Sequence, residues 1–171
     1  MIKKFLGTVI FPGNYDPATV CHMNALRYLS ERSDKVYAVI MTPSEEEPRR
    51  WISSEVMKGL IENALDAMRL NNVFVYIEKD GWLAHSIEKL NADGVARCFH
   101  AYVENSVQEK ELIESVTALN VPVHLLPCRL ELRSSQLRWL SEEGLIDDFK
   151  DQLPESVYLY IKNNNPVSFR Q

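Results

Sequence analysis

The region most informative about the fold lies near the start of the chain and reads Val9-Ile10-Phe11-Pro12-Gly13-Asn14-Tyr15-Asp16-Pro17-Ala18-Thr19-Val20-Cys21-His22. Its apolar beginning, Thr8 to Phe11, has the composition of a buried strand, and the prolines and glycine that follow predict a tightly shaped loop. Apolar residues then recur at the spacing of a helix, as in Met23, Leu26 and Leu29. The first N–H groups of a helix are unpaired and carry partial positive charge. This strand, loop and helix therefore form a candidate phosphate-binding unit.

Composition places the chain among ordinary globular proteins. It has 171 residues, of which 46% are hydrophobic and 25% charged, so we expect a single domain over residues 1–171, with a core from about 6 to 162 and a tail from 163 to 171. The net charge of −5 argues against nucleic-acid partners and leaves small molecules as the expected ligands.

Neither a membrane span nor a secretion signal is expected from the sequence. No apolar run approaches the roughly 18 residues that a spanning helix needs. The first residues carry charge with no long apolar segment behind them. The three cysteines, Cys21, Cys98 and Cys128, are odd in number and form no C-x-x-C pair. They indicate reduced thiols, and hence a cytoplasmic protein without a zinc site.

Beyond the first strand, strand-like and helix-like segments alternate along the chain. The further expected strands are 35–42, 73–77, 95–99 and 122–127, and the further expected helices are one capped by Ser53 or Ser54 and running to Met68, then 82–90, 104–119, 134–143 and 154–162. This alternation predicts an α/β fold, a Rossmann-like doubly wound five-stranded parallel sheet. Ligands of such sheets bind at the carboxyl ends of the strands, where the strand order reverses. Polar stretches fall at three such ends, 13–22, 44–50 and 129–135, and Arg97 places a charge within the fourth strand.

Two motifs in this order carry a resemblance to a known family. The run Gly13-Asn14-Tyr15-Asp16-Pro17-Ala18-Thr19-Val20-Cys21-His22 is similar to the G-T-F-D-P-x-T-x-G-H signature of the nucleotidylyltransferase superfamily. Leu132-Arg133-Ser134-Ser135-Gln136-Leu137-Arg138 resembles its second motif, I-S-S-T/S-x-x-R/K. Ala92-Asp93-Gly94-Val95-Ala96-Arg97 looks like the G-A-D-x-I-V-R segment of bacterial phosphopantetheine adenylyltransferases, and the tail from 153 to 162 is of a kind shared with nicotinate-nucleotide adenylyltransferases. The resemblance spans residues 6 to 162.

The resemblance implies transfer of an adenylyl group from ATP to a phosphorylated acceptor. In that family a substrate phosphate attacks the α-phosphate of ATP and expels pyrophosphate, so catalysis rests on positioning and charge stabilisation. The resemblance implies catalytic roles for His22 at the α-phosphate, Asn14 at the attacking phosphate and Arg97 at the substrates' phosphates. It also implies that Thr19 helps to hold the phosphate chain.

Further positions follow from the same resemblance. Ser134 and Ser135, at a helix start, are expected to hold the β- and γ-phosphates, with Arg138 nearby. The remaining nucleotide-binding positions implied are Gly13, Tyr15 and Gln108. Mg²⁺ is expected to be held mainly by the phosphates of ATP, with no metal ligand from the protein. By resemblance the chain is also expected to form a homo-oligomer, a hexamer.

Several positions depart from the family pattern, mostly on the acceptor side. Cys21 stands where the family has a glycine, so its side chain narrows the space near ATP. Glu45 stands where a lysine binds the attacking phosphate, and Arg49 or Arg50 is the candidate substitute for binding the acceptor. The whole run Glu45-Glu46-Glu47 has the composition of a solvated loop. The other departures are Cys98, His100, Gln108 and Arg133.

Three readings of function therefore stay open from the sequence. The first is adenylyl transfer to 4′-phosphopantetheine, which gives dephospho-coenzyme A and pyrophosphate, with an activity weakened by the departures. The second is the same chemistry on nicotinamide or nicotinate mononucleotide, or cytidylyl transfer to a phospho-alcohol. The third is a degenerate nucleotide-binding protein without turnover.

Overall fold

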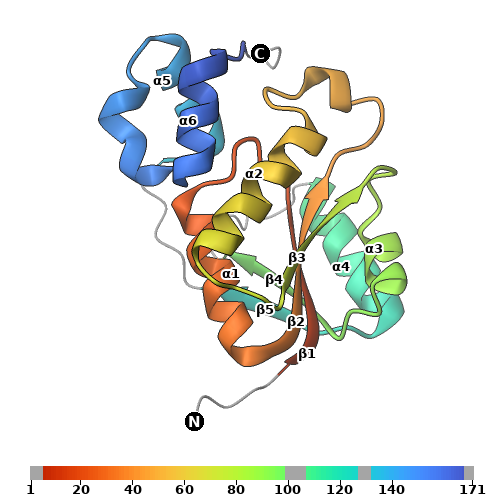
Figure 1. Ribbon diagram of the computed structural model, residues 1–171. Coiled ribbons are helices and arrows are strands. Elements are labelled where there is room, and N and C mark those ends of the chain that lie inside the picture. The colour runs from red at the N-terminus through yellow and green to blue at the C-terminus, as the bar shows by residue number, and fades with distance from the viewer. Residues whose placement is uncertain (1–5, 99–106, 127–131, 168–171) are drawn as a thin grey trace.

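The protein folds around a parallel sheet with helices on both faces (Figure 1). The computed structural model describes residues 6–98, 107–126 and 132–167. Its strands are β1 (Leu6–Gly13), β2 (Ser33–Met41), β3 (Val73–Glu78), β4 (Gly94–Cys98) and β5 (Val123–Leu126). They lie in the order β3-β2-β1-β4-β5, and every neighbouring pair is parallel. The predicted five-stranded, doubly wound sheet is confirmed.

The helices match the segments that periodicity predicted. They are α1 (Val20–Arg32), α2 (Ser54–Ala67), α3 (Leu83–Lys89), α4 (Val107–Leu119), α5 (Ser134–Glu142) and α6 (Glu155–Asn164). Ser53 caps α2, because its hydroxyl accepts a hydrogen bond from Val56 N at 3.3 Å. Two short 3₁₀ helices, η1 (Glu47–Arg49) and η3 (Ile146–Gln152), were not predicted. Both are polar and too short to show an amphipathic period.

Side-chain alternation along the strands divides the core into two layers. Phe11 and Ala38 belong to one buried cluster, which they share with residues of α1, α2, α5 and α6. Ile10 and Val39 point to the opposite face, into a smaller cluster with residues of α3 and α4. In Figure 1, α1 and α2 accordingly lie on one side of the sheet and α3 and α4 on the other. Within the described part of the chain, no helix is long and apolar enough to cross a membrane.

Candidate functional site

The strand order places a crevice between β1 and β4. The chain runs outward from β1 through β2 to β3 and then returns to the other side of β1 to form β4. The pairing of β1 with β4 joins Val9 to Gly94 and Ile10 to Val95, and both strands run on beyond it, to Gly13 and Cys98. In doubly wound sheets the strand ends at such a reversal are where ligands bind. Residues 13–22 and Arg97 both reach this edge of the sheet.

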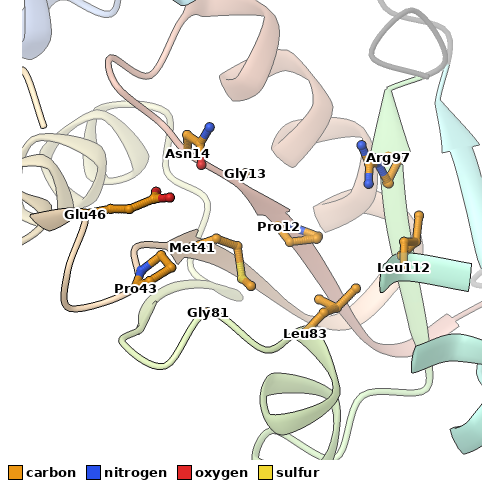
Figure 2. Close-up of a pocket in the computed structure, with 10 residues that line it drawn as sticks. All are labelled: Pro12, Gly13, Asn14, Met41, Pro43, Glu46, Gly81, Leu83, Arg97 and Leu112. Carbon is orange, nitrogen blue, oxygen red and sulfur yellow. The ribbon is translucent and has the colours of Figure 1, made fainter. Parts of the chain in front are cut away.

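A cavity of about 230 Å³ opens at this edge (Figure 2). Its described lining residues are Pro12, Gly13, Asn14, Met41, Pro43, Glu46, Gly81, Leu83, Arg97 and Leu112. Arg97 and Glu46 stand on opposite sides, and Asn14 lies close to the Glu46 side. Side chains of β2, α3 and α4 make the surface between them apolar. A ligand with polar ends and an apolar middle would fit this pattern.

Two glycines are required where the backbone borders the cavity. A Cβ atom on Gly13 would lie 3.3 Å from the Tyr15 ring, which is tighter than ordinary van der Waals contact. Gly81 has φ of +77°, and a Cβ atom there would lie 2.5 Å from Pro43 Cγ. A side chain at either position would therefore move a cavity wall.

The loop after β1 is held by a buried carboxylate. The side chain of Asp16 is fully buried, and its two oxygens accept hydrogen bonds from Trp51 N at 3.0 Å and Ile52 N at 2.9 Å. Arg50 Nη2 lies 4.0 Å from one of these oxygens. Asp16 therefore ties the β1–α1 loop to the segment that precedes α2.

Arg50 strengthens the same connection from the other side. Its side chain is also fully buried, and it donates hydrogen bonds to Ile52 O at 2.9 Å and Tyr15 O at 3.0 Å. Tyr15 has φ of 47°, a left-handed backbone conformation that is costly for an aromatic residue. The Arg50 bond to its carbonyl helps to hold that conformation. Arg50, expected from the sequence as an acceptor-binding residue, lies in this buried network, whereas Arg49 is exposed.

Tyr15 contributes to the site mainly by packing. The ring is 2% exposed, and its hydroxyl donates to Phe11 O at 2.5 Å. Burial raises the pKa of the Tyr15 phenol well above its usual value, with a smaller contribution from Cys98, so the hydroxyl keeps its proton and remains a donor. The Tyr15 ring lies 4.8 Å, centroid to centroid, from the His22 ring.

His22 is oriented by the helix cap in which it takes part. Its Nδ1 atom lies 2.9 Å from Thr19 N and 3.0 Å from Thr19 Oγ1, and Thr19 Oγ1 accepts from His22 N at 3.4 Å. Because a backbone N–H can only donate, Nδ1 is the acceptor, which assigns the imidazole proton to Nε2. Thr19 is itself buried, and the contacts of its side chain with Nδ1 and the backbone N–H of His22 orient the imidazole. His22 therefore carries an N–H donor at Nε2, the ring nitrogen that takes no part in the cap.

The second sequence motif docks directly on the first. Ser134 Oγ, at the start of α5, donates to Pro17 O at 3.0 Å, and the guanidinium of Arg138 donates to Asp16 O. Ser135 is exposed at the first turn of the same helix. The two motifs, more than a hundred residues apart in the chain, thus meet at the β1–α1 loop.

The structure separates the three consecutive glutamates. Glu46 lines the cavity, whereas Glu45 lines a different hollow that also contains Lys79 and Lys89. Glu47 Oε1 accepts from Ser54 N at 2.9 Å and Oε2 from Thr42 Oγ1 at 2.8 Å. Burial tends to raise the pKa of the Glu47 carboxyl, but the bonds from Ser54 and Thr42 outweigh it, so that pKa is lowered. The expectation of a uniformly solvated loop is wrong for Glu47.

A further polar cluster lies beside the cavity, after β3. Ser86 Oγ donates to the buried Glu78 at 2.5 Å, and Asp80 Oδ2 contacts His85 Nδ1 at 2.7 Å. Burial and the neighbouring Asp80 carboxyl raise the pKa of Glu78, and hydrogen bonds from Glu78 and His85 lower the pKa of Asp80 to about 2. This cluster shapes the segment from which Gly81 reaches the cavity.

Some of the expected site residues are described only in part. Gln108 lies in α4, but its side chain is outside what the structure describes. His100, a departure from the family pattern, and Cys128, one of the three cysteines, lie outside the described residues. Cys21 is partly exposed and packs against the core. Among the residues described, no group of three or more His, Cys, Asp or Glu side chains is arranged to hold a metal ion.

Sequence reasoning missed the cavity residues that have no chemical signature. Glu46 was hidden in the acidic run, and Met41, Leu83 and Leu112 read as ordinary core positions. Their position along the chain was the one signal that could have identified them as cavity residues, because Met41 ends β2 and Leu83 begins the helix after β3.

Comparison with solved structures finds the same fold in known adenylyltransferases. A bifunctional NMN adenylyltransferase/ADP ribose pyrophosphatase from Francisella tularensis, complexed with AMP and a manganese ion, matches with a TM-score of 0.67 and 15% identity over 93% of this chain and 49% of that one. Another structure of a bifunctional enzyme of this description from the same organism matches with a TM-score of 0.69 and 17% identity, over 93% of this chain and 49% of that one. A protein assigned as a nicotinate-nucleotide adenylyltransferase from Vibrio parahaemolyticus gives a TM-score of 0.62 at 17% identity, over 93% of this chain and 100% of that one.

These likenesses establish the fold of the chain. The chain spans about half the length of the Francisella enzymes it matches. No model of a protein family matches the sequence, and a search of curated proteins returns no relative.

Proposed function

We propose that this protein is a nucleotidyltransferase that transfers the adenylyl group of ATP to a phosphorylated acceptor, with nicotinamide or nicotinate mononucleotide as the preferred acceptor class. The observation that supports this most strongly is the meeting of both sequence motifs at the β1–α1 loop, through the bonds of Ser134 and Arg138 to Pro17 O and Asp16 O. The loop lies at the edge of the sheet where the strand order reverses and the cavity opens. The solved structures that share the fold carry the names of NMN and nicotinate-nucleotide adenylyltransferases, and for this reason we propose a mononucleotide acceptor in preference to 4′-phosphopantetheine.

In the proposed reaction an oxygen of the acceptor phosphate forms a bond to the α-phosphorus of ATP. The bond from that phosphorus to the bridging oxygen of the β-phosphate breaks, and pyrophosphate leaves with the electron pair. His22 Nε2–H would donate to a non-bridging oxygen of the α-phosphate, where negative charge develops. At the start of α5, Ser134 would hold the leaving phosphates through its main-chain N–H, since its hydroxyl donates to Pro17 O, and Ser135 through its N–H and its hydroxyl. ATP would bring Mg²⁺ on its own phosphate oxygens.

The acceptor would occupy the cavity. Arg97 would bind its phosphate, and the Asn14 amide, which lies closer to the Glu46 side, would donate to a polar group further along the acceptor. The apolar surface around Leu83 would contact the remainder of the acceptor. Positioning of two phosphates in this way supplies most of the rate gain expected of such a reaction.

4′-Phosphopantetheine remains a second candidate acceptor on one observation. The segment that ends in Arg97 resembles the corresponding segment of phosphopantetheine adenylyltransferases, and Arg97 lines the cavity. The apolar lining would also accept a pantetheine arm.

Pyrophosphate release tests the proposal. The purified protein is incubated with ATP or CTP and, in separate reactions, with nicotinamide mononucleotide, nicotinate mononucleotide, 4′-phosphopantetheine or phosphocholine. We expect release with ATP and a mononucleotide. Release with 4′-phosphopantetheine alone would identify the second candidate, and release only with CTP would exclude adenylyl transfer. ATP binding without release in any mixture would favour the reading of a nucleotide-binding protein without turnover.

A further inference from the structure

The cavity is electrically polar, and its two charged side chains stand on opposite sides. Of its described lining residues, Arg97 is the cation and Glu46 the anion (Figure 2). Between them the surface is apolar, with Met41 and Leu83 in view in Figure 2. A phosphate that binds at Arg97 therefore directs the far end of the same ligand towards Glu46.

We infer that Glu46 selects the acceptor, in favour of one whose end away from the phosphate is cationic or an uncharged hydrogen-bond donor, and against one that ends in a carboxylate. This inference rests on the proposed function for the identity of the acceptor. For the two mononucleotides it means that the carboxamide of nicotinamide mononucleotide is preferred to the carboxylate of nicotinate mononucleotide. An amide N–H can donate to the Glu46 carboxylate, whereas a second carboxylate is repelled by it.

The backbone around Glu46 is ordered by short-range hydrogen bonds. Glu46 N donates to Pro43 O at 2.8 Å, and Arg49 N donates to Glu46 O at 2.9 Å. Glu47, the next residue, is anchored by the bonds that its carboxylate accepts from Ser54 and Thr42. The backbone of Glu46 thus belongs to a hydrogen-bonded turn, and its carboxylate points towards the cavity (Figure 2).

The neighbouring Glu45 provides a matched control. It carries the same charge one residue away, but it lines a separate hollow together with Lys79 and Asp80. A general effect of negative charge on this loop would be the same for both glutamates. Selection by contact within the cavity would belong to Glu46 alone.

The expected size of the effect follows from the exposure of Glu46 to solvent. Glu46 is exposed, so its repulsion of a carboxylate at about 4 Å is close to the value in water, which corresponds to a preference of roughly fivefold to tenfold. Because salt screens charges at the surface, the preference should shrink as ionic strength rises.

Equilibrium binding tests the inference without requiring turnover. Dissociation constants for nicotinamide and nicotinate mononucleotide are measured by titration calorimetry on the wild type, Glu46→Gln, Glu46→Lys and Glu45→Gln, and kcat/KM for both acceptors is measured by pyrophosphate release. We expect the wild type to prefer the carboxamide, Glu46→Gln to lose roughly fivefold to tenfold of that preference, and Glu46→Lys to reverse it. Glu45→Gln should keep the wild-type ratio.

The outcomes separate this inference from the proposed function. A preference that changes by less than about twofold in Glu46→Gln, or equally in Glu45→Gln, overturns selection by Glu46. Failure of both mononucleotides to bind overturns it as well. A binding preference that responds to Glu46 with no pyrophosphate release would leave the selection standing and refute the proposed reaction. Pyrophosphate release with a ratio between the two mononucleotides that does not change in the Glu46 variants would support the proposed reaction and overturn selection by Glu46.

Discussion

Replacement of Asp16 by alanine should destabilise the protein severely, because the Asp16 carboxylate is the acceptor for two backbone N–H groups. Those of Trp51 and Ile52 lie 3.0 and 2.9 Å from its oxygens, and the side chain is fully buried. Each buried N–H that loses its acceptor costs about 1–3 kcal/mol. The substitution also removes the carboxylate 4.0 Å from the buried Arg50 guanidinium, which retains its bonds to two carbonyls. We expect a total loss of about 3–5 kcal/mol in the free energy of unfolding.

Two further variants separate the charge from the hydrogen bonds. Asp16→Asn keeps one acceptor oxygen and presents an NH₂ group to the other N–H, so it should cost about 1–3 kcal/mol. Asp66→Ala removes an exposed aspartate from α2 and should change the stability by less than about 0.5 kcal/mol.

Urea unfolding measures these differences by linear extrapolation. Far-ultraviolet circular dichroism follows the whole fold, and tryptophan fluorescence includes the signal of Trp51, which adjoins the affected loop. Coincident transitions by both probes would justify two-state treatment. A loss below about 1 kcal/mol for Asp16→Ala would refute the reasoning, because it would mean that the two N–H groups do not depend on this carboxylate.

Three other substitutions test separate parts of the site. His22→Ala should lower kcat by roughly 10²–10³ with little change in the ATP dissociation constant, because it removes the N–H donor expected at the α-phosphate; pyrophosphate release and ATP titration measure the two, and an unchanged kcat would exclude His22 from the reaction. Glu47→Gln should lower stability near neutral pH, because the lowered pKa of the Glu47 carboxyl stabilises the fold while the group is ionised in both the folded and the unfolded state. The difference from wild type should shrink as the pH falls through the folded pKa, which lies below the usual value of 4.5. Urea unfolding across this range measures the difference, and a difference that grows on acidification would contradict the prediction. Gly81→Ala should cost about 1–2 kcal/mol and raise the KM for the acceptor, because its Cβ would meet Pro43 Cγ at 2.5 Å and φ is +77°; thermal unfolding and acceptor kinetics measure both, and a variant of wild-type stability would contradict the predicted clash.

The strands and helices were predictable because their hydrophobic periods are local. Each strand alternates between two buried faces or forms an apolar run, and α2 repeats its apolar residues at i and i+4. The position of η3 was not predictable, since Ile146–Gln152 is mainly polar and shows no apolar period; η3 contacts both α5 and α1. The order of the strands is also non-local, and it is what brings Arg97 beside the loop after β1.

The roles of the arginines and glutamates depended on partners distant in the chain. The main-chain acceptors of Arg50 include the carbonyl of Tyr15, 35 residues away, and a carbonyl has no signature in the sequence. From the sequence alone, an arginine beside a predicted phosphate site is therefore interpreted as a ligand-binding residue, although the side chain of Arg50 is in fact buried in the scaffold. Likewise, only the turn that begins at Pro43 determines which of three identical glutamates faces the cavity.

The site is built so that its support and its specificity use different residues. The β1–α1 loop is held by Arg50, Ser134 and Arg138 through main-chain carbonyls, and these bonds depend little on the side chains that the loop presents. Asn14 is exposed and lines the cavity, so it can change without loss of these bonds. We therefore expect substitution of an exposed cavity-lining residue such as Asn14 to cost little stability, and substitution within the support to destabilise the loop. On the proposed function, a change at Asn14 would therefore alter how the acceptor is bound, because the bonds of Arg50, Ser134 and Arg138 that position the loop would stay in place.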